Sequence, residues 1–253
     1  LHSTQWGYFD PIDTPDGANI GLQKHLSITT HITQGYSREP ILKWLREKID
    51  MRLLEDCSPL LLSRMTKVFV NGLFAGAIVD PMNAIEKIRM FRRNGLIPIY
   101  TSVSFNIKQN TVFIYTDAGR PSRPIFYKDV DTDKMSYDKE NVLDKIEKDD
   151  YTWNEMISGF NPKKKGAEFN PNESRIYEFS ELYAGVEEKE PENVKRFNKN
   201  KAILDYIDPS ETEDAFIALN VEDLDKDEDK KYTHLEIHQS LIFGMMCNLI
   251  TFP

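Results

Sequence analysis

Three aspartates near the start of the chain are the first residues whose type and spacing could do chemistry. Asp10, Asp13 and Asp16 lie three positions apart, and carboxylate oxygens are the ligands that hard divalent cations prefer. A proline follows Asp10 and another follows Thr14, so both of these residues are pushed toward extended backbone and the carboxylates cannot line one helix face. The stretch "TPDG" (14–17) has the composition of a turn, with Gly supplying a positive φ. We therefore expect a shaped loop here, in preference to a metal site.

A second acidic stretch, "DKDEDKKYTHLE" (225–236), partly matches a calcium-binding loop. Carboxylates stand at the first, third and fifth positions, and Glu236 stands at the twelfth. The sixth position, where such loops need Gly for a sharp turn, is Lys230. We expect no tight calcium binding, and a stand-alone acidic module that binds calcium or protein is kept as the alternative function.

The stretch "HLEIH" places His234, Glu236 and His238 on one face if it is a strand, or the two histidines one turn apart if it is a helix. Zinc would need a further ligand, and the spacing differs from that of the metalloprotease motif. We therefore predict that these residues are structural and that the chain contributes no metal ligand. No nucleophile elbow, P-loop or dinucleotide fingerprint is present in the sequence, so no catalytic residue is predicted.

Charge and cysteine content restrict the class of protein. The net charge of −9 is unevenly spread, because residues 1–125 carry 15 basic against 11 acidic side chains and residues 126–253 carry 17 against 30. Contact with a polyanion would therefore involve the first half. Cys57 and Cys247 lie far apart in apolar contexts, which indicates a reducing intracellular compartment, with one long-range disulfide left open. No apolar run is long enough to span a membrane, and the abrupt ends predict a piece of a larger protein.

The pattern of apolar residues predicts an α+β fold of mixed antiparallel hairpins and helices. The first half should contain a strand at 25–33, a helix at 38–50 and a hairpin at 67–79 turning at Asn71-Gly72. A helix at 80–95 capped by Asp80 and a second antiparallel pair at 101–126 should follow. Four basic residues of the 80–95 helix, Lys87, Arg89, Arg92 and Arg93, should lie on its other face, for which we expect solvent and keep contact with nucleic acid as the alternative.

The second half is more charged and less periodic. We expect a helix at 137–151, an exposed loop at 161–174, short strands at 201–208 and 213–219, and a buried helix at 238–250. The stretch "TDAGRPSRP" should form a turn fixed by Gly119 and Pro121, with Arg120 or Arg123 paired to a nearby carboxylate or carbonyl.

Four stretches taken together resemble one family. They are "LHSTQWGYFDPIDTPDGANIGL", "VFVNGLFAGAIVDPMNAIEKIRMFRRNG", "IYTDAGRPSRPIF" and "THLEIHQSLIFG" with the closing "ITFP". Their order and spacing resemble the second-largest (β-like) subunit of multisubunit DNA-directed RNA polymerases of the archaeal, eukaryotic or large-DNA-virus type. The resemblance implies an internal fragment with four parts: the end of the fork (1–60), a first part of the external domain (61–127), a second part with a charged variable insertion (128–219), and the start of the hybrid-binding region (220–253).

The resemblance also implies what the opening loop does. Its residues would lie in the active-centre cleft near the RNA–DNA hybrid and shape that cleft; they are Asp13, Thr14, Pro15, Asp16, Gly17 and Asn19. The family usually has glutamates where this chain has Asp13 and Asp16, which shortens any contact they make. Residues with an implied or inferred structural role are Asn71, Gly72, Asp117, Gly119, Arg120, Arg123, His234, Glu236 and His238.

The remaining expectations also follow from the resemblance. The partners would be the other polymerase subunits, chiefly the largest, together with the DNA template and the RNA–DNA hybrid. The catalytic Mg²⁺ would be bound mainly by the largest subunit, so the fragment alone should bind no cofactor and be inactive. A location in the nucleus or in the cytoplasm is left open, the host cytoplasm being expected for a large cytoplasmic DNA virus.

Overall fold

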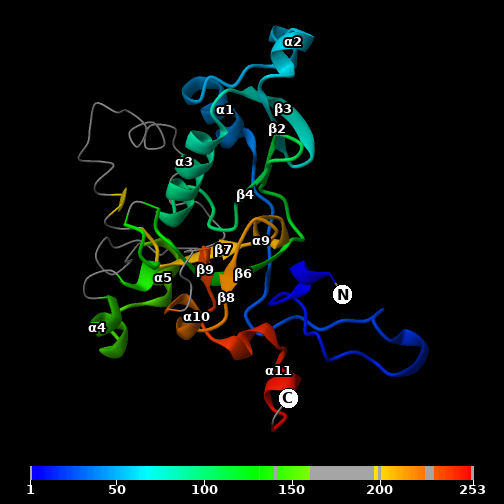
Figure 1. Ribbon diagram of the computed structural model, residues 1–253, viewed down its shortest axis with the longest axis vertical. Helices are drawn as coiled ribbons and strands as arrows, with labels where there is room; N and C mark the ends of the chain where they lie inside the picture. The colour runs from blue at the N-terminus through cyan, green and yellow to red at the C-terminus, as the bar shows by residue number, and fades with distance from the viewer. Residues whose placement is uncertain are drawn as a thin grey trace.

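The computed structural model describes residues 2–130, 132–138, 142–159, 197–198, 201–225 and 231–251. Helices and two β-sheets alternate along these ranges, which confirms the predicted α+β class (Figure 1). The predicted exposed loop at 161–174 and residues 226–230 of the calcium-like stretch lie outside the described residues.

The first sheet has four strands in the order β3-β2-β5-β4. Their bounds are Thr66–Val70 (β2), Leu73–Ile78 (β3), Ser102–Asn106 (β4) and Thr111–Tyr115 (β5). Strands β2 and β3 form the predicted hairpin, and the turn residues Asn71 and Gly72 have φ of 50° and 77°, as a type I′ turn requires. Strands β4 and β5 form the second predicted antiparallel pair, whereas β2 and β5 run parallel.

Two helices, α1 (Glu39–Lys48) and α3 (Pro81–Arg93), contribute to the main hydrophobic core with this sheet. Helix α3 begins as predicted, because the Asp80 carboxylate accepts a hydrogen bond from the Asn83 amide at 3.2 Å, and Gly95 follows its end with a φ of 66°. The buried side chains of the two helices pack against the valines and isoleucines of the sheet: they are Ile41, Leu42, Trp44, Leu45, Ala84, Ile85, Ile88 and Phe91. Each large one contributes roughly 1.5–3 kcal/mol by leaving water.

The second sheet is organised around its longest strand, β6 (Pro121–Tyr127). Its first residues pair with β1 (His31–Ile32), its middle pairs with β7 (Leu204–Ile207), and its end pairs with β9 (His234–Leu235). Strand β8 (Ile217–Ala218) then runs parallel to β9. The sheet therefore joins the start, middle and end of the chain.

Short helices and turns complete the described structure. The helices are α2 (Pro59–Leu62), α4 (Val142–Glu147), α5 (Trp153–Ser158), α9 (Pro209–Thr212), α10 (Val221–Asp225) and α11 (Met245–Asn248). The 3₁₀ turns are Ser3–Gln5, Gly17–Asn19, Leu54–Asp56, Ser136–Asp138 and Gln239–Ile242. Helix α4 is the observed part of the helix predicted at 137–151, and β7 and β8 are the two short strands predicted in the second half.

The predicted strand at 25–33 is wrong in length and in the face that it buries. Only His31 and Ile32 are strand residues, and Leu26 and Ile28 are about half exposed. The hydroxyl residues Ser27 and Thr33 are buried in their place. Both hydroxyls donate hydrogen bonds to carbonyls of distant segments, which removes the cost of burying them.

The predicted buried helix at 238–250 is also wrong. The segment forms a 3₁₀ turn and the short helix α11, separated near Gly244, and Met245, Met246 and Leu249 are at least 64 % exposed. Composition misled here, since Cys247 is the buried member of this helix. Both cysteines are free thiols, so the disulfide left open by the sequence is not formed.

Arg92 corrects the prediction of a solvated basic face on α3, because its side chain is only 1 % exposed. Its guanidinium lies 2.8 Å from Asp205 of β7 and donates to both carboxylate oxygens of Glu211 in α9. Burial alone lowers the pKa of an arginine, but the two carboxylates outweigh it and raise the pKa of Arg92 above its ordinary value. Asp205 also pairs with Arg93, and the two guanidinium groups overcome burial to lower its pKa.

Replacing Arg92 by Met should therefore destabilise the fold strongly, because two buried carboxylates lose their cation. We expect a loss of about 3–5 kcal/mol in the free energy of unfolding measured by urea denaturation. Lys87→Met on the same helix is the matched control and should change stability by less than about 1 kcal/mol. A small effect of Arg92→Met would show that Asp205 and Glu211 are accommodated without it.

Candidate functional site

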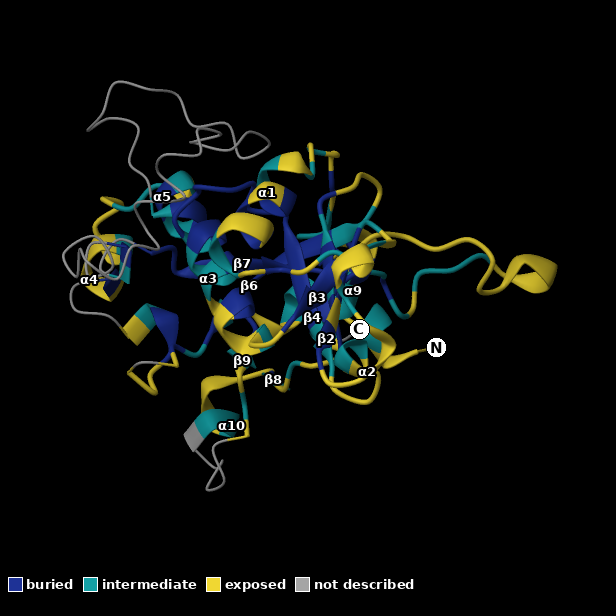
Figure 2. Ribbon diagram, turned by 90° about the horizontal axis from the view of Figure 1, so that it is seen from above, coloured by how far each residue is buried: buried dark blue, intermediate teal, exposed yellow. Residues whose placement is uncertain are grey.

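The candidate site is the loop at 11–25, which extends away from the body of the molecule (Figure 1) and is exposed along most of its length (Figure 2). A short antiparallel neck closes its base. Phe9 and Leu26 form a β-bridge, the Asp10 amide donates to the His25 carbonyl at 2.8 Å, and the Ser27 amide donates to a carbonyl across the neck at 3.0 Å. The loop is thus tied at its base and free at its tip.

Backbone geometry determines the shape of the loop. Gly17 and Gly21 have φ of 78° and 75°, a region that L side chains rarely adopt. The Thr14 hydroxyl donates to the Gln23 carbonyl at 3.1 Å and accepts from the Gly21 amide at 2.9 Å, so it links the two arms. The positive φ at Gly17 agrees with the predicted turn, and the tip residues Asp16–Asn19 are exposed.

The carboxylates of the loop are not gathered into a cation site. Asp10 points its oxygens at amides, Asp13 lies 3.8 Å from His25, and Asp16 makes no capping hydrogen bond. Within the described ranges, no group of three or more His, Cys, Asp or Glu side chains is placed to hold a metal ion. The residues therefore do not fit a Mg²⁺ centre, and no chemical step can be assigned to the loop through such an ion.

The C-terminal segment braces the neck from one side. One Asp10 carboxylate oxygen accepts from the Ile12 amide at 2.9 Å and the other accepts from the Gly244 amide at 2.7 Å. On the opposite arm, the Ser27 hydroxyl donates to the Ile242 carbonyl at 2.7 Å. Residues more than 200 positions apart in the chain therefore meet at the base of the loop.

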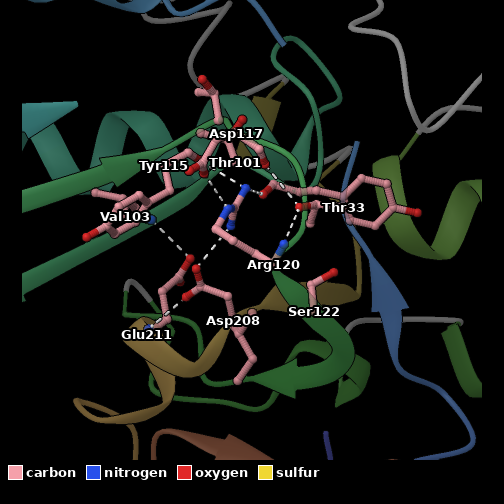
Figure 3. A network of polar contacts seen from close by, with 12 residues as sticks. Thr33, Thr101, Val103, Tyr115, Asp117, Arg120, Ser122, Asp208 and Glu211 are labelled. Atoms are coloured by element: carbon pink, nitrogen blue, oxygen red, sulfur yellow. Dashed lines mark hydrogen bonds and ion pairs between the residues drawn. The ribbon is translucent and has the colours of Figure 1, made fainter. Parts of the chain in front are cut away.

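A polar network beside the neck is centred on Arg120 (Figure 3). Its guanidinium donates to Asp117 at 2.9 Å, to Asp208 at 3.0 Å and to the carbonyls of Tyr100 and Tyr115. Asp208 is the N-cap of α9, so the same carboxylate also accepts from the Glu211 amide at 3.0 Å. Arg120 thereby connects the turn before β6 to α9, the helix whose Glu211 pairs with Arg92.

The turn that carries Arg120 is itself held by the extended segment before α1. The Thr33 amide donates to the Arg120 carbonyl at 2.9 Å, and the Gly119 amide donates to the Thr33 carbonyl at 2.9 Å. Gly119 has a φ of 84°. The predicted turn at Gly119 is therefore present, with Asp117 as a direct partner of Arg120.

Arg123 lies under the neck with a separate partner. Its Nη1 donates to Glu236 at 2.6 Å, and both side chains are at most 4 % exposed. Its guanidinium also lies 5.3 Å from the centre of the Tyr8 ring. A Cβ at Gly7 would approach the Arg123 guanidinium to 2.5 Å, so only Gly fits at that position.

Tyr8 ties the neck to α9. Its hydroxyl donates to the Ile207 carbonyl at 3.1 Å and lies 2.7 Å from the Thr212 hydroxyl. Burial raises the pKa of this phenol well above its usual range, so it stays a neutral donor.

The two histidines of "HLEIH" do not meet. His234 contacts the Thr233 hydroxyl at 2.8 Å, and burial lowers its pKa to about 3, so it is neutral. His238 contacts the Ser240 hydroxyl at 2.7 Å and accepts from the Ser240 amide. Strand β9 ends at Leu235, and Glu236 turns to Arg123.

The structure thus places the predicted site residues in separate parts of the molecule. The loop holds one set, and Asn71 and Gly72 form the β2–β3 turn. The Arg120 turn holds Asp117 and Gly119, and Glu236 pairs with Arg123. His234 and His238 contact hydroxyls next to them in the chain. Sequence reasoning missed that Asp10 ties the loop to the C-terminal segment. Its position directly before a proline indicated extended backbone, but no local signal names a partner 234 positions away.

Comparison with known proteins identifies the same family over two stretches. Residues 1–32 match the family described as RNA polymerase Rpb2, domain 3, and residues 68–129 match RNA polymerase Rpb2, domain 4. The first stretch contains the loop and its neck, and the second runs from β2 to the end of β6. No helix of the described residues is long and apolar enough to cross a membrane.

Curated relatives match the whole chain. It is 29 % identical to DNA-directed RNA polymerase II subunit 2 of Arabidopsis thaliana over 100 % of this chain and 18 % of the relative. It is 31 % identical to subunit RPB2 of Eremothecium gossypii (100 % and 20 %) and 26 % identical to subunit Rpo2 of Sulfolobus acidocaldarius (100 % and 19 %). The chain spans about a fifth of the length of these relatives. It belongs to the family of second-largest subunits of DNA-directed RNA polymerases.

Proposed function

We propose that this chain is a structural part of the second-largest subunit of a DNA-directed RNA polymerase and that its 11–25 loop shapes the active-centre cleft near the RNA–DNA hybrid. The observation that carries the proposal is the match of the whole chain to such subunits, with the loop lying inside the stretch that matches Rpb2 domain 3. The activity is that of the assembled nucleotidyltransferase. On this proposal the chain works inside the cell with the other subunits, chiefly the largest, and with DNA template and hybrid.

The geometry of the loop supports a role through shape. The loop has two glycines at positive φ and one threonine bridging its arms, and its carboxylates are dispersed. Exposed carboxylates repel phosphate, so Asp13 and Asp16 do not favour nucleic acid directly. Asn19, an exposed amide just past the turn, is the residue we propose for a contact to nucleic-acid backbone or to a side chain in the cleft.

The polar network beside the neck supports a purely structural role for Arg120. Its side chain is 13 % exposed and its donors are directed at two carboxylates and two carbonyls. A guanidinium used in this way has few donors left for phosphate. The proposed boundaries of 1–60, 61–127, 128–219 and 220–253 for the four parts of the subunit also belong to this proposal.

We predict that the loop tolerates loss of charge better than loss of backbone freedom. In reassembled polymerase, Gly17→Val should slow elongation more than Asp16→Asn, because Val is strained at a φ of 78° although nothing lies within 4 Å of the added Cβ. Asn19→Ala removes the amide and so tests the proposed contact. The elongation rates of the three variants would be compared at matched incorporation of the subunit. Loss of elongation with Asp16→Asn while Gly17→Val is tolerated would show a carboxylate site instead.

Replacing Arg120 by Ala should lower the melting temperature of the chain, because the Asp208 carboxylate, 2 % exposed, loses its cation. A loss of roughly 2–4 kcal/mol in the free energy of unfolding is expected. Arg38→Ala, at a residue with a long contact of 3.9 Å to an exposed glutamate, is the control and should have little effect. Unchanged stability combined with weaker nucleic-acid binding by the assembled enzyme would assign Arg120 the opposite role.

Calcium titration tests the alternative of a stand-alone calcium-binding module. The sixth position of the calcium-like stretch is Lys230 and cannot supply the sharp turn of a Gly. Isothermal titration of the chain with calcium should give no binding at micromolar concentrations. Micromolar affinity would favour the module over the polymerase part.

A further inference from the structure

The base of the loop is held by a segment from the other end of the chain. Residues 242–247 contact both arms of the neck: Gly244 contacts Asp10 on the outgoing arm, and Ile242 and Phe243 contact Ser27 and Ile28 on the returning arm. The Ile28 amide donates to the Phe243 carbonyl at 3.0 Å. A loop held only by its own neck could swing, whereas here one further segment of the chain holds both arms of the neck. We call this contact the clamp.

The Asp10 carboxylate is the centre of this clamp. It accepts hydrogen bonds from the amides of Ile12, Asp13 and Gly244 at 2.9, 3.2 and 2.7 Å, and from the thiol of Cys247. Two of these donors belong to the loop and two belong to the C-terminal segment. The residue is 6 % exposed, so an unpaired carboxylate here would be costly.

The charge states of the two side chains fit this arrangement. Burial alone raises the pKa of Asp10, but the donors, with the Cys247 thiol first among them, outweigh it and lower the pKa below its ordinary value. The same hydrogen bond is the largest of the effects that raise the pKa of the Cys247 thiol to about 11, and burial and the negative charges of Asp10 and Asp13 add to it. At neutral pH the carboxylate is therefore ionised and the thiol is a protonated donor.

Gly244 shows how closely the two segments approach. A Cβ built at this position would lie 2.8 Å from the Asp10 carboxylate and 3.2 Å from the Leu26 carbonyl, one atom on each arm of the neck. The φ of Gly244 is −76°, which any residue adopts. The need for Gly at this position is therefore one of space.

We propose that Asp10 is the positioning residue of the cleft-shaping loop, and that its ionised carboxylate fixes the base of the loop to residues 242–247. This inference rests on the function proposed above for the loop. Asp10 touches no reacting group and acts through the backbone that it holds. A neutral amide of the same size offers one acceptor oxygen in place of two and cannot satisfy donors on both segments at once.

The test is the pH dependence of alkylation of Cys247 in the full 253-residue chain, with Cys57 as the internal reference. Iodoacetamide reacts with the thiolate, so the rate at Cys247 should still be rising at pH 10 in the parent chain. In Asp10→Asn the apparent pKa should fall toward the ordinary value of about 8.5, and a complete fall would raise the thiolate fraction at pH 8 by about 240-fold. The rate at Cys57 should not change.

Cleavage by trypsin after Lys24 reports on the loop in the same samples. Asp10→Asn should accelerate this cleavage several-fold, and Gly244→Ala should do the same while leaving the Asp10 charge in place. Asp16→Asn, an exposed loop aspartate outside the clamp, is the matched control and should change neither readout. An equal increase at both cysteines would show general loosening of the fold and would overturn the proposal, as would unchanged Cys247 alkylation and Lys24 cleavage in Asp10→Asn.

Elongation by reassembled polymerase separates this inference from the proposed function. If Asp10→Asn alters alkylation and cleavage and slows elongation, both are supported. If it alters alkylation and cleavage but leaves elongation unchanged, the clamp is supported and the cleft-shaping role of the loop fails.

Discussion

The buried cation of Arg92 is the interaction on which the rest of the structure depends. It lies on the last turn of α3, where a purely apolar side chain would complete the helix face, and it contacts Asp205 of β7 and Glu211 of α9. Glu211 also accepts from the Val103 amide of β4, and the Arg92 guanidinium donates to the Thr101 carbonyl. Four elements from both halves of the chain therefore share one charge cluster. Removing water from such a cluster is costly, so the carboxylates of β7 and α9 must be in place when Arg92 is buried.

From this cluster a continuous set of polar contacts reaches the loop. Asp208 caps the helix that contains Glu211, and its carboxylate accepts a hydrogen bond from Arg120 in the turn before β6. On the other side, Thr212 of the same helix meets Tyr8, which stands next to the neck of the loop. The exposed tip thus stands on a base that is buried and held by ion pairs and hydrogen bonds, and such support allows a loop to present one shape to a partner.

Local signals explain which parts of the structure could be predicted. Asn71-Gly72 favours a tight turn and Asp80 followed by Pro81 favours the start of a helix, and both preferences are local. The predicted hairpin and helix therefore agree with the structure to within a residue or two. Arg92 was misjudged because a charged residue beside an apolar stripe indicates solvent unless its partners are known, and those partners lie more than 110 positions away. The predictions around Ser27 and for the 238–250 segment were wrong for the same reason. Hydrogen bonds to distant carbonyls and contacts with the loop neck determine which of their side chains are buried. The roles of the loop residues rest on the family resemblance, because no spacing in the sequence specifies them.

The separation of Arg92 and Glu211 by 119 positions has a consequence for the order of events during synthesis. At about 5–20 residues per second, a ribosome adds the intervening chain in roughly 6–24 s. The β2–β3 hairpin closes within microseconds of emerging, and the α3 stripe can pack on it soon after. Arg92 must stay hydrated throughout that interval, with its side of α3 facing water. The first sheet is therefore an incomplete folding unit while it is being made, and its docking to the second sheet waits for the arrival of two carboxylates.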